Sequence, residues 1–381
     1  MNRPRMLTPT RDEWNRFVCA QPGATIYQSY EWGDIRYTNG WKPIYLALEE
    51  GGVWIAAALI LAKRLPGGMG TILYSPRGPI VTQWDRAMPL LKEAVQELAR
   101  ERKAMFWRIE PPVVADDAGA GDILSRAGFS SVPQEWSYWN RPKYEMQLDI
   151  AEGETAVFAK LTSKIRTKVR HASKRGVVIE EGCGEQDLES FYRLLQDTGM
   201  KKRIPVRGLE YFRTVYRTFV KSGMGRLFVA RKDGIPVAGG LTVRFGSTAT
   251  LLYLSNDYSM QRAGWAVQWD MLRWAMAQGC TTYDFGGTGT SYPPQETDKG
   301  YGVYQFKQSF GAQIVRWYGY ADYVFAPARY AAFRLLERNL PLGERVLIEW
   351  PKQMLYRWRP KAARTDGSAD ESSRKTTTKE P

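Results

Sequence analysis

Hydrophobic and β-branched residues form paired runs at two places in the chain, one in each half. Residues 42–64 contain two such runs separated by Gly51-Gly52, and residues 225–246 contain two separated by Asp233-Gly234. Short apolar runs bounded by turn residues are typical of strands, and Asp-Gly is a strong signal for a tight hairpin turn. The pattern therefore predicts one β-hairpin in each half.

The same order of patterns follows each hairpin. A strand-like run is followed by an amphipathic helix, a short strand, and a segment in which Gly and Phe are adjacent. In the first half these are residues 71–81, 87–103, 104–112 and 123–132, and in the second half 248–257, 264–279, 280–287 and 305–314. The repeated order predicts a duplicated α+β fold, with similar domains at 1–145 and 146–325 that meet across a cleft.

The C-terminal part of the chain has a different character. Residues 326–358 have the pattern of amphipathic helical segments with basic and aromatic faces, which either pack on the body or contact a membrane surface. Residues 359–381 are rich in Ser, Thr, Lys and Asp and contain no large apolar residue. We therefore expect a helical extension followed by a disordered tail.

Composition excludes several classes of protein. Hydrophobic residues make up 44% of the chain, but no run approaches the roughly 18 apolar residues of a membrane-spanning helix. The first residues lack the apolar core of a signal peptide, and Cys19, Cys183 and Cys280 lie too far apart for a disulfide scaffold or a zinc site. His171 is the only histidine, so a histidine general base is not expected. We expect a cytoplasmic protein without a metal.

The net charge of +14 favours polyanionic partners, such as nucleic acid, an anionic membrane or phosphorylated substrates. Residues 159–176 concentrate this charge, since no carboxylate lies between Glu154 and Glu180. Apolar residues at helical spacing form one face of this segment: Leu161, Ile165, Val169 and Ala172. The segment predicts a helix whose cations, among them Lys164, Lys168 and Arg170, are either a solvated face or a contact with RNA phosphates.

A second cation stands in an apolar setting. Lys307 lies in a glycine-bearing stretch, residues 299–312, with four aromatic residues around it: Tyr301, Tyr304, Phe306 and Phe310. One interpretation is a core element from which the lysine reaches to water. The other is a cation aimed into a cleft, where a low dielectric strengthens its field.

The order of elements resembles the N-acetyltransferase (GNAT) fold, in which each domain is a mixed sheet flanked by helices. In that fold a Q/R-x-x-G-x-G/A loop holds the pyrophosphate of coenzyme A at a helix N-terminus. Residues 261–266 fit this string, although Trp265 is bulky at a place where backbone approaches phosphate, and the first half has no equivalent. Coenzyme A binding therefore stays an alternative.

Five motifs together resemble the Fem-type peptidoglycan aminoacyltransferases, in which two GNAT-like domains are fused. They are YQSYEWGDIRYTNGW (27–41), KLTSKIRTKVRHASKRGV (160–177), IPVRGLEYF (204–212), YDFGG (283–287) and KGYGVYQFKQSFG (299–311). No sustained heptad pattern follows residue 176, so the chain is similar to the compact members that lack a coiled-coil arm.

The resemblance implies transfer of an amino acid from aminoacyl-tRNA to an amine of a peptidoglycan precursor, carried on a nucleotide sugar or on lipid II. Aminoacyl-tRNA is then the co-substrate and no further cofactor is expected. We expect a monomer. Because the acceptor can be lipid-linked, the resemblance also allows a peripheral contact with the inner face of the membrane.

The resemblance also implies roles for particular residues. Lys307 matches the family's cation near the transfer centre. Arg207 and Tyr211 match the pair that grips the diphosphate end of the acceptor, and Tyr253 fits a strand tyrosine that lines the same cleft. Arg36 stands where compact members often carry Lys, which keeps the charge but replaces a point cation by a planar fork.

Such a transfer makes modest chemical demands, because an aminoacyl ester is already activated. The protein has to align amine and ester and to stabilise negative charge on the carbonyl and ribose oxygens. Other functions stay open: a similar transferase for a small metabolite or peptide, a coenzyme A-dependent N-acyltransferase, or a non-catalytic RNA- or membrane-binding protein. Asp284, at a predicted strand end, either caps a turn or relays a proton.

Overall fold

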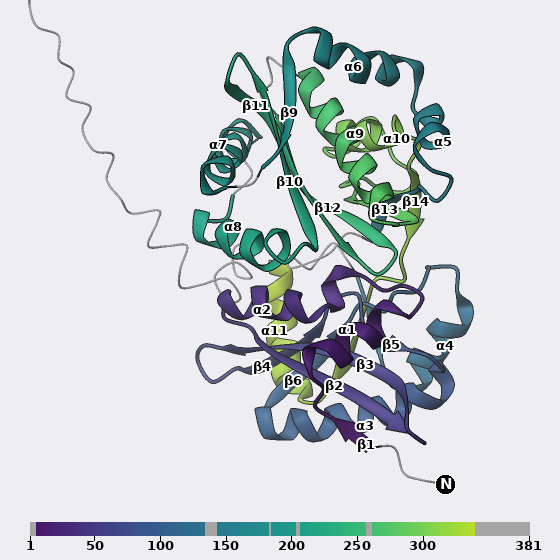
Figure 1. Cartoon of the computed structure of the whole chain (residues 1–381). Helices are drawn as coiled ribbons and strands as arrows, with labels where there is room; N and C mark the ends of the chain where they lie inside the picture. The colour runs from purple at the N-terminus through teal and green to yellow at the C-terminus, as the bar shows by residue number, and fades with distance from the viewer. Residues whose placement is uncertain (1–4, 134–142, 183, 203–205, 257–260, 340–381) are drawn as a thin grey trace, which may run out of the picture.

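The computed structural model describes residues 5–133, 143–182, 184–202, 206–256 and 261–339. Two domains stack on one another, each built on one mixed sheet with helices on both faces (Figure 1). This confirms the predicted α+β fold of two tandem GNAT-like domains. In the described ranges no helix combines the length and apolar character needed to cross a bilayer.

The sheet of the first domain has the strand order β1-β2-β3-β4-β6-β15-β7, with β5 paired to β3. The strands are β1 (Arg5–Leu7), β2 (Lys42–Glu50), β3 (Val53–Leu65), β4 (Gly70–Ser75), β5 (Ile80–Val81), β6 (Ala104–Ile109), β7 (Ser130–Val132) and β15 (Tyr320–Val324). Its helices are α1 (Arg11–Cys19), α2 (Tyr30–Thr38), α3 (Trp84–Arg102), α4 (Ala118–Arg126) and α11 (Pro327–Asn339), with a 3₁₀ turn η1 (Ile26–Gln28).

The sheet of the second domain has the order β14-β8-β13-β12-β11-β10-β9. The strands are β8 (Tyr144–Asp149), β9 (Val177–Glu181), β10 (Gly225–Lys232), β11 (Ile235–Phe245), β12 (Thr248–Asn256), β13 (Thr282–Gly287) and β14 (Gln313–Arg316). The helices are α5 (Glu154–Lys160), α6 (Ser163–Lys174), α7 (Glu185–Lys202), α8 (Leu209–Val215), α9 (Gln261–Ala277) and α10 (Tyr301–Gln308), with a π-helical turn η3 (Tyr216–Val220).

Both predicted hairpins form. β2 pairs antiparallel with β3, and β10 pairs antiparallel with β11. Positive φ angles occur at both turns, 60° and 85° at Gly51-Gly52 and 51° and 79° at Asp233-Gly234. Two consecutive positive φ angles match the twist of the flanking strands, which is why Gly and Asp occupy these positions.

The repeated unit behind each hairpin is a helical crossover. β4 pairs parallel with β6, and α3 connects them; β12 pairs parallel with β13, and α9 connects them. Neighbouring parallel strands require such a crossover because the chain must return to the end of the sheet at which the first strand began. Both domains therefore contain the strand–helix–strand order that the sequence predicts.

The cores follow from this layering. One apolar cluster lies between the first sheet and α3 and α4, and another lies between the second sheet and α5, α6, α9 and α10. A third cluster joins residues of both domains, such as Ile35 on α2 and Phe212 on α8, each at most 2% exposed. The domain junction is thus a continuous apolar core in which α2 lies against α8 and η3.

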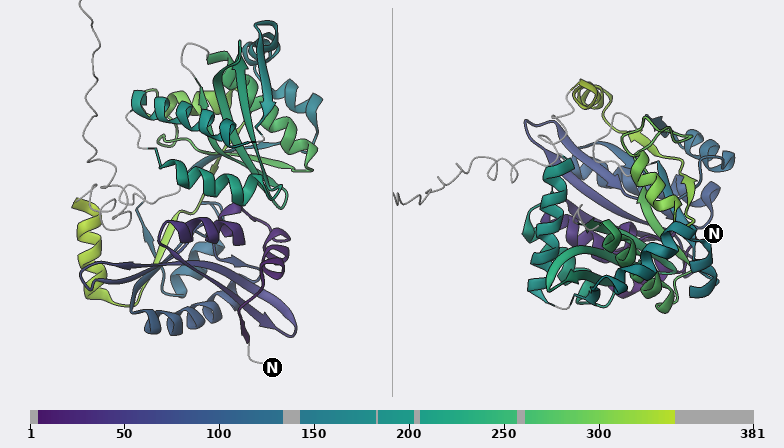
Figure 2. Two further views of the ribbon diagram at one scale, coloured as in Figure 1. Left: turned by 60° about the vertical axis from the view of Figure 1, so that its left-hand side comes forward. Right: turned by 90° about the horizontal axis from the view of Figure 1, so that it is seen from above.

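The sheets divide the chain differently from the predicted limits 146–325 and 326–358. After β14 the chain returns to the first domain, where β15 inserts between β6 and β7 and α11 packs along one side (Figure 2). Arg108 on β6 holds this return segment: it forms a two-point contact with Asp322 at 2.7 Å and also binds Glu337 at 2.8 Å, all with fully buried side chains. The rest of the predicted extension and the tail, residues 340–381, lie outside the described residues.

The basic segment also differs from its prediction as one helix over 159–176. It forms two helices, α5 and α6, because Leu161 has an extended backbone with φ −66° and ψ 142°. The peptide N–H of Thr162 donates to the carbonyl of Ser309, so the break is tied to the end of α10. The predicted apolar face is otherwise present, with Leu161, Ile165 and Ala172 buried.

Candidate active site

Lys307 lies near the C-terminal end of α10, and its side chain is buried. Its Nζ donates to the carbonyl oxygens of Gly286 at 2.9 Å and Gly287 at 2.6 Å, and the residue is 5% exposed. The pairing of β13 with β8 is irregular between Asp284 and Gly287, and Gly286 has a φ of 71°. This irregularity presents two successive carbonyls to one ammonium group. A snorkelling lysine would reach solvent instead.

Burial changes the acidity of this lysine. Removal from water lowers the pKa of Lys307 to about 8, while the carboxylates of Asp284 and Glu145 act in the opposite direction. Desolvation disfavours the charged form, and nearby carboxylates favour it. Near neutral pH the group is therefore still largely protonated but can lose its proton more readily than a surface lysine. Its catalytic role stays a prediction.

The aromatic residues around Lys307 connect α10 to α9 and α6. Trp265 on α9 packs against Phe306 at 4.4 Å and against Phe310 at 5.6 Å between ring centroids. The Nζ of Lys168 on α6 lies 4.2 Å from the centroid of the Trp265 ring. The basic helix and the helix of Lys307 thus share one aromatic cluster.

The other two cations of the predicted RNA contact lie on the outer side of α6. Lys164 and Arg170 are exposed, and the guanidinium of Arg170 lies 5.1 Å from the ring centroid of Phe158. Lys168 is half-buried by its contact with Trp265. The three residues therefore occupy one helix, but only Lys168 reaches the aromatic cluster of α10.

A second group of predicted residues meets at the domain junction. The hydroxyl of Tyr253 on β12 lies 3.1 Å from that of Tyr211 on α8, and the guanidinium of Arg207 lies 4.8 Å from the Tyr211 ring centroid. Burial is the main cause that raises the pKa of Tyr253 well above its usual value, with Tyr211 adding to it. These three residues form one cluster, and their role in binding stays a prediction.

Arg36 belongs to the first domain but lies close to this cluster. It occupies the last turn of α2, with its guanidinium 5.3 Å from the ring centroid of Trp41. Asn39 caps the same helix through its backbone N–H to the Arg36 carbonyl, and its side-chain oxygen accepts from Arg207 at 3.5 Å. Sequence reasoning missed Asn39, because an asparagine after a helix is an ordinary cap and only domain docking brings it to Arg207.

The two predicted groups are distinct in the structure. Tyr211 and Tyr253, with Arg207 beside Tyr211, lie on the face of the second sheet that carries α7 and α8, whereas α10, which carries Lys307, packs with α9 on the opposite face. Nothing in the described contacts joins Lys307 directly to Tyr253. The strands of the second sheet, which the two groups flank, are therefore the element that fixes their separation.

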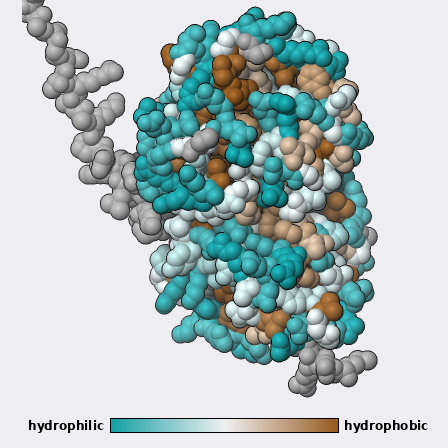
Figure 3. Space-filling model, in the orientation of Figure 1, coloured by the Kyte–Doolittle hydropathy of each residue, from teal (hydrophilic) through white to brown (hydrophobic). Residues whose placement is uncertain are grey.

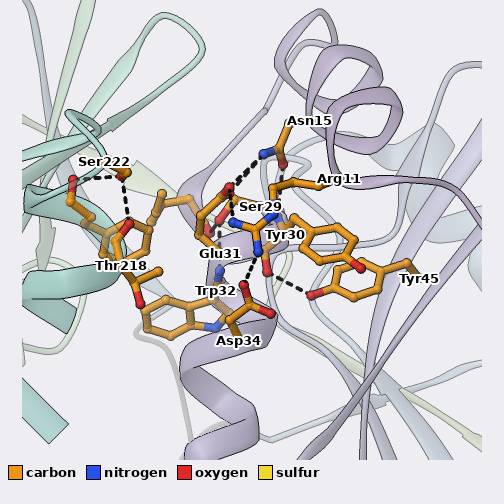
Figure 4. A network of polar contacts seen from close by, with 12 residues as sticks. Arg11, Asn15, Ser29, Tyr30, Glu31, Trp32, Asp34, Tyr45, Thr218 and Ser222 are labelled. Atoms are coloured by element: carbon orange, nitrogen blue, oxygen red, sulfur yellow. Dashed lines mark hydrogen bonds and ion pairs between the residues drawn. The ribbon is translucent and has the colours of Figure 1, made fainter. Parts of the chain in front are cut away.

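A network on α2 fixes the first domain's side of the junction (Figure 4). Glu31, only 4% exposed, accepts from Asn15 at 2.9 Å and pairs with Arg11 at 3.3 Å. Arg11 also binds Asp34 at 2.7 Å. Figure 4 shows Glu31 and Asp34 on the part of α2 that faces Thr218 and Ser222 of the second domain, with Arg11 and Asn15 reaching them from α1. These contacts, which centre on the buried Glu31, help to fix the orientation of α2, which carries Arg36.

An ion pair buried between the domains was not predicted. Arg77, in the loop after β4, places its Nη2 2.7 Å from Oε2 of Glu145, the second residue of β8, and the two side chains are 3% and 1% exposed. The indole N–H of Trp317 donates to the same oxygen at 2.8 Å, and Arg77 lies over the Trp317 ring. The sequence around Arg77, Ser-Pro-Arg-Gly-Pro, carries only the pattern of a turn.

The face seen in Figure 3 is largely hydrophilic, with apolar residues in separate small groups. Within the described ranges, no grouping of His, Cys, Asp and Glu side chains has the arrangement that holds a metal ion.

The protein consists of two GNAT-like domains, the fold of acyltransferases. A model of the acetyltransferase (GNAT) domain matches residues 159–307. A tandem GNAT protein from the clavulanic acid biosynthesis pathway superposes with a TM-score of 0.53 over 84% of this chain and 98% of that one, at 11% identity. The crystal structure of FemX superposes with a TM-score of 0.80 over 87% of this chain and all of that one, at 22% identity.

The chain belongs to the FemAB family, whose model matches residues 9–231, more than half of its length. It is 25% identical over 403 residues to the lipid II:glycine glycyltransferase of Staphylococcus haemolyticus (strain JCSC1435), covering 87% of this chain and 95% of that protein. It is 24% identical over 405 residues to the enzyme of the same name from Staphylococcus aureus (strain USA300), with the same coverage. The recognised resemblance to Fem-type transferases is thereby confirmed.

Proposed function

We propose that this protein is an aminoacyltransferase that moves an amino acid from aminoacyl-tRNA to an amine of a peptidoglycan precursor. Its membership of the FemAB family supports the proposal, as do relatives named lipid II:glycine glycyltransferase that align over 87% of the chain. The acceptor amine would belong to the stem peptide, on a lipid-linked or a nucleotide-linked precursor.

One structural observation carries the proposal: a buried lysine and a basic helix pack on the same aromatic cluster. Trp265 contacts Phe306, the neighbour of Lys307, on one side and Lys168 on the other. Phosphates of a tRNA bound along α6 would therefore place its acyl-bearing end near α10. A basic helix alone would suit any polyanion, but Trp265 of α9 connects α6, through Lys168, to the helix that carries Lys307, through Phe306.

The proposed reaction needs charge stabilisation and proton movement. The acceptor amine attacks the ester carbonyl, the bond to the ribose oxygen breaks, and an amide forms. The ribose oxygen gains a proton, and the amine loses one. Lys307, protonated at neutral pH, would stabilise the developing negative charge, and its lowered pKa of about 8 also suits it to supply the leaving oxygen with a proton.

The second cluster would bind the acceptor. Arg36 and Arg207 come from different domains, and Asn39 links them: its backbone N–H donates to the Arg36 carbonyl, and its side-chain oxygen accepts from the Arg207 guanidinium. Guanidinium groups bind phosphate oxygens in a two-point geometry, which fits the diphosphate of a lipid-linked or nucleotide-linked precursor. Tyr211 and Tyr253 would hold Arg207 and line the same place.

The test is transfer itself. The protein is incubated with a full pool of charged tRNA and with lipid II or a UDP-linked precursor, and the acceptors are analysed by mass spectrometry. The expected result is an acceptor heavier by one or more aminoacyl residues, lost when the tRNA is digested with RNase. Transfer that persists after RNase treatment, or none with any wall precursor, would contradict the proposal.

Acceptor swapping separates the proposal from its neighbour, a related transferase that uses a small metabolite or peptide. That enzyme would need charged tRNA but would leave wall precursors unchanged. The same swap between nucleotide-linked and lipid-linked precursors identifies the natural acceptor. A lipid-linked acceptor would require a cytoplasmic enzyme that works at the inner face of the membrane, and we propose this location and a monomeric state.

A coenzyme A-dependent N-acyltransferase is the second candidate, since the GNAT model covers residues 159–307. In the structure α9 begins at Gln261, and the ring of Trp265 is engaged with Phe306, Phe310 and Lys168. Acetyl transfer from acetyl-CoA, together with thermal stabilisation by this compound, would favour the second candidate over the first.

A further inference from the structure

The ion pair between Arg77 and Glu145 is a buried polar contact between the domains that the functional assignments leave unused. Both side chains are at most 3% exposed, and their closest atoms are 2.7 Å apart. The backbone N–H of Arg77 also donates to Glu110 at 3.1 Å, so the loop that carries Arg77 is held from behind. A buried charge pair costs desolvation energy, and a hydrophobic pair often serves stability better. Stability alone is therefore a weak explanation for this ion pair.

Glu145 lies on the strand next to the one that binds Lys307. In the second sheet Glu145 on β8 is the register partner of Gly287 on β13. The carbonyl of Gly287 accepts the shorter of the two hydrogen bonds from Lys307 Nζ, at 2.6 Å. Of the carboxylates that act on Lys307, Asp284 belongs to β13 itself, whereas Glu145 also binds a cation of the other domain. One side chain thus connects Lys307 to the first domain.

We propose that Arg77 and Glu145 are positioning residues for Lys307: the ion pair across the domain junction holds the strand that anchors the lysine and sets its charge. The role of Lys307 itself rests on the proposed function. Neither Arg77 nor Glu145 touches substrate in this proposal; each acts through the lysine. The protonation of Lys307 then depends on the docking of the two domains. If Arg77 were removed, the carboxylate of Glu145 would no longer be neutralised and would favour the ammonium form of Lys307 more strongly.

The proposal predicts opposite effects for its two partners. Glu145→Gln removes a carboxylate that favours the ammonium form, so the pKa of Lys307 falls further. Arg77→Gln removes the cation that offsets this carboxylate, so the pKa of Lys307 rises. A charge within about 4–6 Å of a titrating group shifts its pKa by about one unit or more. A pair with a merely structural role would loosen the site in both variants and move the pKa the same way, toward that of an exposed lysine.

The experiment is a titration of the lysine side chain in the full chain, labelled with ¹³C-lysine and followed by NMR. The Lys307 signal is assigned by its loss in Lys307→Met. The expected results are a midpoint below that of the wild type for Glu145→Gln and above it for Arg77→Gln. Equal midpoints, or shifts of the same sign, overturn the inference.

Asp322→Asn is the matched control. It breaks another buried arginine pair, Arg108–Asp322, which lies within the first domain. It is expected to lower stability as the test variants do, yet to leave the Lys307 midpoint unchanged; a shift as large as theirs would contradict the inference.

Two further variants cover the case in which Arg77→Gln does not fold. Arg77→Lys keeps the charge and should keep the midpoint near that of the wild type. Trp317→Phe keeps an aromatic ring and both charges but removes the indole N–H that binds Glu145 at 2.8 Å, and should raise the midpoint slightly. A lowered midpoint in Trp317→Phe counts against the inference.

Activity separates this inference from the proposed function. In the transfer assay, the alkaline limb of the kcat profile should move with the Lys307 midpoint, down for Glu145→Gln and up for Arg77→Gln. If the wild type transfers no amino acid but the midpoints move as stated, the proposed function fails and the positioning of Lys307 stands. If transfer occurs and the midpoints do not move, the inference alone fails.

Discussion

Lys307 is the residue on which the proposed chemistry depends most. We expect Lys307→Met to lower kcat by about 10²- to 10³-fold, the usual loss when one preorganised charge at the reacting oxygen is removed. KM for the acceptor should change little, because Tyr211 and Tyr253, which are proposed to line the acceptor site, lie on the other face of the second sheet. The measurement is steady-state transfer from charged tRNA. Lys42→Met, at an exposed position of the first domain, is the control and should retain full activity.

The lowered pKa of Lys307 gives activity and stability opposite pH dependences. Activity should fall as pH rises through about 8, since the ammonium that stabilises the oxyanion is lost. In the unfolded chain the pKa returns to 10.5, so between pH 8 and 10.5 the unfolded state binds more protons and stability rises with pH. The full effect is about 3 kcal/mol.

Denaturant unfolding of the wild type and of Lys307→Met across this window tests the sign. The difference in unfolding free energy between the two proteins should move in favour of the wild type as pH rises. A difference that stays constant from pH 7 to 10.5 would show that the lysine titrates as it does in water.

Arg36 and Arg207, which are proposed to bind the acceptor, should affect acceptor binding. We expect Arg36→Ala and Arg207→Ala each to raise KM for a diphosphate-bearing acceptor by about tenfold, because each removes one charge-assisted hydrogen-bonding group. Arg36→Lys keeps the charge but loses the planar fork, so its effect should be smaller. Measured with an acceptor that lacks the diphosphate, all three variants should resemble the wild type; an equal loss there would assign the arginines to folding.

At the scale of elements, α6 is the part of the molecule that should recognise tRNA. The double variant Lys164→Ala/Arg170→Ala removes two exposed cations and leaves the buried face intact. Each cation that binds a phosphate should, when removed, reduce the slope of log K against log salt by about one. Binding of charged tRNA across a salt series measures it, with Arg64→Ala/Arg100→Ala, exposed on the first domain, as the control. An unchanged slope would make α6 an ordinary solvated face.

Local patterns predicted a helix, strand or turn well where the residues that stabilise it all lie within the same segment. The hairpins at Gly51-Gly52 and Asp233-Gly234 and the crossover helices α3 and α9 were identified because turn residues and apolar periodicity are local. The basic segment was predicted as one helix, but α5 ends where Thr162 binds the carbonyl of Ser309. That hydrogen bond comes from a distant segment, which the helical pattern does not contain.

At the scale of the whole molecule, the return of the chain to the first domain should be essential for stability. Asp322→Asn leaves the guanidinium of Arg108 with half of its two-point contact in a fully buried place. Breaking one partner of a buried pair costs about 3–5 kcal/mol. Thermal unfolding should show a large fall in Tm. Asp85→Asn, which breaks the exposed pair with Arg126, should cost at most about 1 kcal/mol. Equal effects would contradict the structural role given to the buried pair.

The candidate site shows the same division between local and long-range causes. Lys307, Arg36, Arg207, Tyr211 and Tyr253 were predicted because the motifs around them resemble those of Fem-type transferases, and their roles stay predictions. Asn39 and the pair Arg77–Glu145 were missed, since an asparagine after a helix and an arginine in a turn carry no distinguishing pattern. Their contacts exist because the two domains dock.

By itself the sequence determined the duplicated order of strands and helices, the positions of the hairpin turns, the concentration of positive charge in residues 159–176 and the aromatic setting of Lys307. These properties depend on neighbours along the chain, through backbone conformation and side-chain periodicity. Only the tertiary structure decided that β15 completes the first sheet, that Tyr253 and Lys307 lie on opposite faces of the second sheet, and that a buried ion pair joins the domains next to the strand that binds Lys307. The reason is physical: burial and charge pairing act between segments far apart in sequence, and they exist only once the chain has packed.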